Sequence, residues 1–186
     1  MDQDLARDDM LILVDGLDRV VGEASKEQAH RKGLLHRAFS VVLVDRFEGT
    51  LKILLARRAE GKYHSAGLWA NSCCSHPRVG EQTMSAACRR VEEELGLRDV
   101  SLVEISAFCY RAPLSDGIVE FEYDHVYLGG AKGTLWPDPT EVSETRWESV
   151  DAVARELSEH PERFCAWAPM VLSQAMAVLK HQNVVI

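Results

Sequence analysis

Apolar residues fall into short runs separated by turn-forming residues along the first third of the chain. Four such runs predict two strand pairs, 11–14 with 19–21 and 38–44 with 51–56. Turn-like segments at 15–18 and 47–50 separate the members of each pair, and a helical turn or two is expected to follow from Ser25. The N-terminal part of the chain is therefore expected to be mainly β-structure.

Later in the chain the hydrophobic period changes more than once. Helical spacing is seen at Met84, Ala87, Cys88, Val91 and Leu95. It predicts a helix over 85–95, with Gly96 as its C-cap. Further strands are expected at 102–110, 118–128 and 146–148, and helices at 150–157 and 168–180. Strands first, with helices packed on the outside, indicate an α+β sandwich.

The predicted strand 118–128 alternates strictly. Its apolar positions Val119, Phe121 and Tyr123 are interleaved with Glu120, Glu122 and Asp124, so three carboxylates share one face. For an isolated strand this alternation favours a solvated polar face. Two carboxylates two residues apart are also a geometry that holds a metal ion, so both interpretations stay open at this point.

Composition and charge exclude several classes of function. Lys and Arg total 21 against 29 Asp and Glu, a net charge of −8, so no general basic surface exists for a nucleic acid. The apolar runs are far shorter than the roughly 20 residues that cross a bilayer, and the acidic N-terminus does not have the features of a secretory signal. Five cysteines, an odd number with Cys73 and Cys74 adjacent, do not form a plausible disulfide framework. A cytoplasmic protein is expected.

Candidate chemistry is concentrated in the segment 71–77. Cys74 and His76 lie two residues apart, so on an extended segment both side chains face one cavity. A buried cysteine is also a common small apolar residue. His30 and His36 precede a strand and are either ligands or exposed polar residues. Three imidazoles and two carboxylates, His30, His36, His76, Glu120 and Glu122, would together suit zinc or manganese.

The predicted helix ending at Gly96 carries a second pattern. Its arginines and glutamates lie within one turn, which is typical of ion pairs within a helix. The spacing also resembles the Nudix box, through the matching residues Glu81, Arg89, Val91, Glu93, Glu94, Gly96 and Leu97. Two positions depart from it: Ser75 replaces the first glycine, and Arg90 replaces the glutamate after the arginine. Because the family's helix glutamates hold magnesium for diphosphate hydrolysis, Arg90 disfavours a hydrolase and suits an enzyme that leaves a diphosphate intact.

Taken together, the chain resembles the type I isopentenyl-diphosphate delta-isomerases, which have a Nudix fold. The resemblance extends over roughly residues 11–172 and rests on the order and spacing of four segments, 33–40, 68–77, 110–112 and 117–122. It implies a single domain over 1–186 with a core of about 36–172. The implied fold is a Nudix-type α/β/α sandwich with a mixed sheet, an additional N-terminal hairpin and C-terminal helices.

The resemblance also implies roles for individual residues. It places a Mn²⁺ or Zn²⁺ ion on His30, His36, His76, Glu120 and Glu122, and a Mg²⁺ ion on Glu94. The implied catalytic groups are Cys74, Glu122, Tyr110 and Trp167, and the implied diphosphate-binding cations are Lys26, Arg58, Lys62 and Arg90. The implied reaction interconverts isopentenyl and dimethylallyl diphosphate in isoprenoid biosynthesis. The implied partner is this small molecule, with no flavin or nucleotide cofactor, and the chain would be a monomer or a weak homodimer.

Isopentenyl diphosphate carries an unactivated terminal alkene, so shifting its double bond adds one proton and removes another through a tertiary carbocation. Glu122 and Cys74 are expected to handle these protons, and the indole of Trp167 is expected to face the cation. Trp167 is also typical of ordinary core packing. Two other functions are weighed against this one: a Nudix hydrolase of nucleoside or isoprenoid diphosphates, and a structural zinc module. The zinc module would use Cys73, Cys74 and His76, although adjacent cysteines are poorly placed to share one tetrahedral zinc ion.

Overall fold

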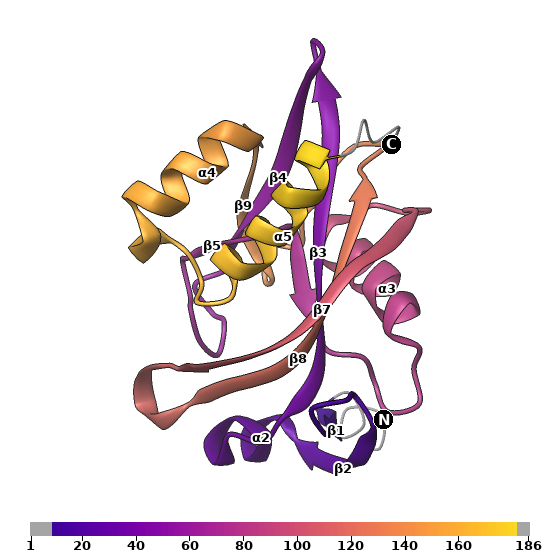
Figure 1. The fold of residues 1–186 in the computed structure, drawn as a ribbon, viewed down its shortest axis with the longest axis vertical. Coiled ribbons are helices and arrows are strands. Elements are labelled where there is room, and N and C mark those ends of the chain that lie inside the picture. Colours follow the sequence, from indigo (N-terminus) through magenta and orange to yellow (C-terminus); the bar gives the residue numbers. More distant parts are fainter. Residues whose placement is uncertain (1–8, 182–186) are drawn as a thin grey trace.

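A computed structural model describes residues 9–181 (Figure 1). Its centre is the long strand β3 (His36–Phe47), which pairs with β1, β4, β6 and β8. The strand β8 (Val119–Gly130) runs parallel to β3, whereas β7 (Leu102–Pro113) runs antiparallel to β8. The mixed sheet is completed by β4 (Thr50–Arg58), β5 (Trp69–Ala70), β6 (Cys73–Ser75) and β9 (Val142–Ser149).

The N-terminal hairpin is confirmed. It consists of β1 (Met10–Val14) and β2 (Val20–Ser25), and helix α2 (Lys26–Lys32) follows directly. The Ser25 hydroxyl caps α2 by accepting the Gln28 amide at 3.2 Å. Gly33 ends the helix in the left-handed conformation, at φ 59°. That reversal brings the chain from α2 into β3 within a few residues, so His30 and His36 lie side by side with ring centroids 5.1 Å apart.

The helices cover both faces of the sheet, as the sandwich prediction requires (Figure 1). On one face α3 (Thr83–Leu95) packs on a core that includes Val41 and Leu43. On the other face α4 (Val150–Glu159) and α5 (Ala168–His181) pack on a core that includes Val42 and Val44. Successive residues of β3 thus pack into opposite cores, which is why its middle, from 38 to 44, is apolar except for Ser40. Two short 3₁₀ turns, Ser115–Gly117 and Pro161–Arg163, complete the elements. No helix in 9–181 is both long and apolar enough to cross a membrane.

The polar face of β8 is buried, so the solvated-face interpretation of its alternation is wrong. Glu120, Glu122 and Asp124 are 2%, 8% and 1% exposed. They are covered by side chains from other parts of the chain, with His30 and His64 against Glu120 and His76 against Glu122. The register places His36 beside Glu122 from β3 and Tyr110 beside Glu122 from β7. Sheet pairing therefore collects three of the predicted site residues at one level.

Candidate active site

A cavity of about 240 Å³ lies over the buried carboxylates. Most of the predicted site residues line it: Lys26, Arg58, Lys62, Cys74, His76, Arg90, Tyr110, Glu120, Glu122 and Trp167. Cys74 reaches it from β6 and His76 from the residue directly after that strand, as their two-residue spacing predicted. His30 and His36, both fully buried, adjoin the same carboxylates.

The imidazoles and carboxylates form two groups that share one histidine. Within each group, the ligand atoms lie within 4.8 Å of one another. One group is His30, His36, His76 and Glu122, and the other is His30, His64 and Glu120. In the first, His76 Nε2 is 2.9 Å and His36 Nε2 is 3.6 Å from Glu122 Oε1. In the second, His30 Nε2 is 3.4 Å and His64 Nε2 is 2.7 Å from Glu120 Oε1. The five residues predicted to hold the metal are thus all in one place.

The chemistry of these groups fits a divalent ion. Both ring nitrogens of His30 and the Nε2 of His36 are buried and have no hydrogen-bond partner within the described chain. Burial lowers the pKa of His30 to about 4 and the pKa of His76 well below its usual value, so both are neutral imidazoles, the form that binds metals. His36 Nδ1 donates to the Leu34 carbonyl at 2.9 Å, which fixes the ring and leaves Nε2 facing Glu122. A nitrogen and oxygen donor set of this kind suits Zn²⁺ or Mn²⁺.

Cys74 is half-buried and lies among hydrogen-bonding side chains. Its thiol donates to Asn71 Oδ1 at 3.0 Å and accepts the indole N–H of Trp167 at 3.1 Å, with Ser40 Oγ at 3.6 Å. The Asn71 amide is in turn held by the carbonyls of Val41 and Cys73 at 3.0 and 3.1 Å. Burial raises the pKa of the Cys74 thiol, so it keeps its proton at neutral pH. The indole of Trp167 thus has a polar partner and is more than core packing.

Glu122 is held by a short hydrogen bond from the next strand. The Tyr110 hydroxyl donates to Glu122 Oε2 at 2.6 Å, while Oε1 faces His76 and His36. Burial alone raises the pKa of Glu122, but His36 and the hydrogen bonds outweigh it and bring the pKa to about 2. Burial raises the pKa of Tyr110 well above its usual value, so the phenol remains a donor. Both carboxylate oxygens of Glu122 are therefore engaged.

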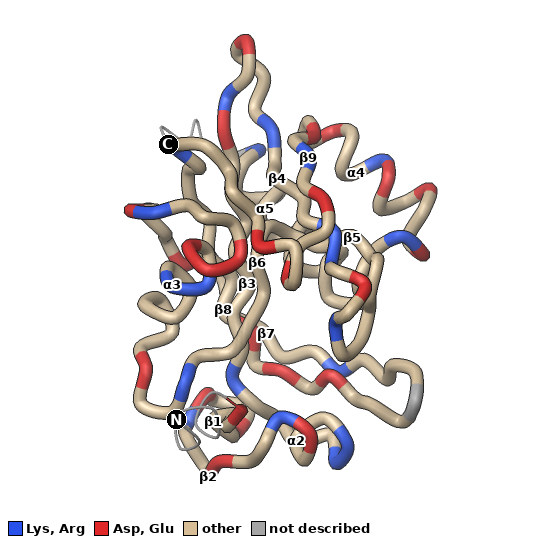
Figure 2. Tube along the Cα trace, turned by 180° about the vertical axis from the view of Figure 1, so that it is seen from behind, with Lys and Arg blue, Asp and Glu red and all other residues tan. Residues whose placement is uncertain are grey.

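Cationic side chains line the same cavity. The Arg58 guanidinium donates to the His64 carbonyl at 3.3 and 3.1 Å and lies 5.4 Å from the Trp167 ring centroid. Burial lowers the pKa of Lys26, with Lys62 and Arg58 adding to the effect. Elsewhere Lys and Arg are interspersed with Asp and Glu along the chain (Figure 2), so the concentration of cations around the cavity is local.

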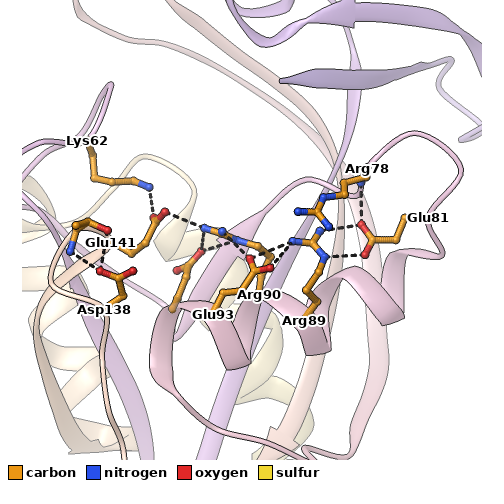
Figure 3. Close-up of polar contacts among 10 residues, drawn as sticks. Lys62, Arg78, Glu81, Arg89, Arg90, Glu93, Asp138 and Glu141 are labelled. Atoms are coloured by element: carbon orange, nitrogen blue, oxygen red, sulfur yellow. Dashed lines mark hydrogen bonds and ion pairs between the residues drawn. The ribbon is translucent and has the colours of Figure 1, made fainter. Parts of the chain in front are cut away.

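The Nudix-like helix α3 carries the ion pairs expected from its spacing (Figure 3). Arg89 binds Glu81 at 2.8 Å and Glu93 at 3.1 Å. Arg90 pairs with Glu94 at 2.6 Å and with Glu141 at 3.2 Å. Glu141 also pairs with Lys62. Burial raises the pKa of Glu94, which lines a small neighbouring cavity together with Cys73 and Cys74. Arg90, which stands where the Nudix box pattern expects a glutamate, therefore pairs directly with Glu94.

The structural zinc module is not supported. Cys73 packs into the core beneath α3, whereas Cys74 packs against the opposite core. Among residues 9–181, neither thiol belongs to a group of side chains that could hold a metal ion. The two adjacent cysteines point to opposite faces of the sheet, as alternation along a strand requires.

His64 was missed by the sequence analysis. It lies in the loop between β4 and β5, where no periodicity marks it, and its side chain is only 8% exposed. One signal in the sequence points to His64: it lies after Arg58 and Lys62 and before the segment 71–77, all of which are predicted parts of the site.

Comparison with known proteins agrees with this geometry. A NUDIX domain matches residues 34–168. A crystal structure from Deinococcus radiodurans covers 89% of this chain and 98% of its own, with a TM-score of 0.70 at 20% identity. The NUDIX domain of Shewanella oneidensis NrtR, solved with ADP ribose, covers 78% of this chain and 87% of its own, with a TM-score of 0.61 at 16% identity. The chain thus has the Nudix fold, as predicted.

Closer relatives narrow the class. The isopentenyl-diphosphate Delta-isomerase of Serratia proteamaculans is 44% identical over 160 residues, 86% of this chain and 87% of that protein. The one from Photobacterium profundum is 42% identical over 177 residues, 94% of this chain and 98% of that protein. This chain belongs to the isopentenyl-diphosphate Delta-isomerase family.

Proposed function

We propose that this protein interconverts isopentenyl diphosphate and dimethylallyl diphosphate. The observation that carries the proposal is the convergence of two proton-transferring groups on one cavity. Cys74 and Glu122 both line it, and each is oriented by a hydrogen bond, from Trp167 and Tyr110 respectively. Hydrolysis needs neither a buried thiol nor an indole at this place, whereas moving a double bond needs two proton carriers close to one alkene.

In the proposed mechanism the residues of this chain handle the protons. One of the pair Cys74 and Glu122 adds a proton to the terminal alkene carbon, and the other removes a proton from the carbon nearer the diphosphate. Between these steps the charge is carried by a tertiary carbocation. The Trp167 indole supplies electron density toward it without a nucleophilic atom, a contribution of about 1–2 kcal/mol in a dry site. Tyr110 holds the Glu122 carboxylate in one orientation throughout.

Metal ions complete the proposed site. His30, His36, His76, Glu120 and Glu122 would hold Mn²⁺ or Zn²⁺, and Glu94 would hold Mg²⁺ close to the diphosphate. The bound ions supply fixed positive charge that orients carboxylates and neutralises phosphate oxygens. The support for the first site is its set of buried ring nitrogens that have no partner in residues 9–181.

The diphosphate would lie against the cations at the cavity margin. Arg58 can bind it with two parallel N–H donors, and Lys26, Lys62 and Arg90 would add charge. Binding energy from this part of the substrate is remote from the reacting carbons and can hold them in place. A reducing compartment, the cytoplasm, is part of the proposal because the reaction requires Cys74 as a free thiol.

The test separates isomerisation from hydrolysis. Purified protein is stripped with a chelator, reloaded with Zn²⁺ or Mn²⁺ plus Mg²⁺, and incubated with isopentenyl diphosphate. Formation of dimethylallyl diphosphate in the loaded protein, and its loss after stripping, is the expected result. Release of inorganic phosphate or pyrophosphate without an allylic product would instead establish a Nudix hydrolase.

A further inference from the structure

We propose that His64 is an additional protein ligand of the divalent metal held by the buried histidines and glutamates, so that four imidazoles bind one ion. The inference rests on the metal site proposed above and adds a ligand to it. It also names the preferred ion, because imidazole donors favour zinc whereas carboxylate oxygens favour manganese and magnesium.

The fold fixes the His64 ring in the site. Its backbone carbonyl accepts two hydrogen bonds from Arg58, at 3.3 and 3.1 Å. Its ring packs edge-on against Trp167 at 5.9 Å and against His30 at 5.8 Å between centroids. The side chain is 8% exposed. A surface loop does not ordinarily bury an imidazole in this way without a partner for its nitrogens.

The donor spacings within the group of His30, His64 and Glu120 are close to those around a metal ion, and this group shares His30 with the other ligand group. Donors at about 2.1 Å from an octahedral metal lie about 3 Å from their nearest neighbours. His64 Nε2 is 2.7 Å from Glu120 Oε1, comparable to the 2.9 Å between His76 and Glu122. The same Glu120 oxygen is 3.4 Å from Nε2 of His30, and His30 belongs to both ligand groups. The two groups therefore meet at one buried imidazole that has no other hydrogen-bond partner among residues 9–181.

The second nitrogen of His64 supports direct ligation. Its Nδ1 lies 3.3 Å from the Ser65 hydroxyl oxygen. A histidine that binds metal through one nitrogen usually donates its other N–H to an oxygen, which fixes the tautomer. With the proton on Nδ1, Nε2 carries a free electron pair directed at the Glu120 side of the site. The alternative is that Nε2 carries the proton and only hydrogen-bonds Glu120.

Nuclear magnetic resonance of the whole protein distinguishes these two arrangements without mutation. Loading with an NMR-active cadmium isotope gives scalar coupling across every metal–nitrogen bond and none across a hydrogen bond. We expect four coupled imidazoles in the isotope-labelled protein, one of which is absent in the spectrum of His64→Gln. A spectrum in which the His64 ring is uncoupled would overturn the inference.

Zinc affinity gives a second readout that does not depend on isomerase activity. In chelator competition, His64→Ala and His64→Gln should each bind Zn²⁺ at least about tenfold more weakly, the lower limit for losing even an indirect partner of a ligand. Their Mn²⁺ affinity should fall less, and His160→Ala, an exposed histidine outside the cavity, should match the parent protein. Thermal melts of the metal-free proteins check that the variants fold.

The failures are distinguishable. Unchanged zinc affinity in both His64 variants overturns the inference and leaves the proposed function standing. A parent protein that binds neither zinc nor cadmium overturns the metal site of the proposed function and this inference together.

Discussion

The hydrogen bond between Tyr110 and Glu122 allows one substitution to be predicted in detail. Tyr110→Phe removes a single oxygen, which donates to Glu122 Oε2 at 2.6 Å in a site where Tyr110 is 6% exposed. A hydrogen bond to a charged group contributes about 1.5–3 kcal/mol, and every 1.36 kcal/mol is a factor of ten in rate. We therefore expect kcat to fall by about 10- to 100-fold. KM should change little, because the phenol contacts the carboxylate rather than the diphosphate-binding cations.

The assay follows dimethylallyl diphosphate formation at saturating metal over a range of substrate concentrations. Tyr123→Phe is the matched control, because Tyr123 is the next residue after Glu122 on β8 and belongs to the opposite face of the strand. Thermal melts exclude loss of folded protein as the cause. A kcat for Tyr110→Phe within twofold of the parent would refute the role assigned to this hydrogen bond, and so would a large rise in KM with kcat unchanged.

Three other predictions test the site and the fold. Cys74→Ala should abolish isomerisation. Cys73→Ala should keep the activity, because the Cys73 thiol lies in the core on the opposite face of the sheet. Comparable loss of activity in both variants would refute the role assigned to Cys74. Gly96→Ala should lower the melting temperature by about 2–10 °C, because φ is 71° and a Cβ would come within 2.8 Å of a tryptophan side chain; an unchanged melting temperature would contradict this. The ion pair with Arg89 lowers the pKa of Glu81 below its usual 4.5, so its stabilisation is present above about pH 4.5 and lost as pH falls. Glu81→Gln should therefore melt lower than the parent at pH 7, and the difference should shrink as the pH falls below 4.5. A difference that stays constant into acid would contradict the ion pair as its source.

The helices and strands could largely be predicted from hydrophobic spacing, because their limits are set by residues within the same short segment. Helix α3 ends where Gly96 can adopt a positive φ, and the hairpin β1–β2 turns where polar residues interrupt two apolar runs. The outcome for β8 shows the limit of such patterns. Alternation determined that the three carboxylates of β8 share a face. Whether that face is buried depends on side chains far away in sequence that pack over it, among them His30, His64 and His76.

The site residues could be predicted from the sequence only where they lie close together along the chain. Cys74 lies in β6 and His76 directly follows that strand, so their two-residue spacing placed both in the cavity. His64 has no such neighbour. It reaches Glu120 from a loop whose path is set by hydrogen bonds from Arg58 and by packing on Trp167, and neither contact is encoded in a local pattern.

The central claim is that this protein transfers protons on isopentenyl diphosphate and leaves the diphosphate intact. The most direct test is incubation of the metal-loaded protein with that substrate in heavy water, followed by NMR of the products. We predict dimethylallyl diphosphate carrying deuterium in a methyl group, with no deuterium incorporation by Cys74→Ala. Unlabelled substrate together with free phosphate would contradict the claim.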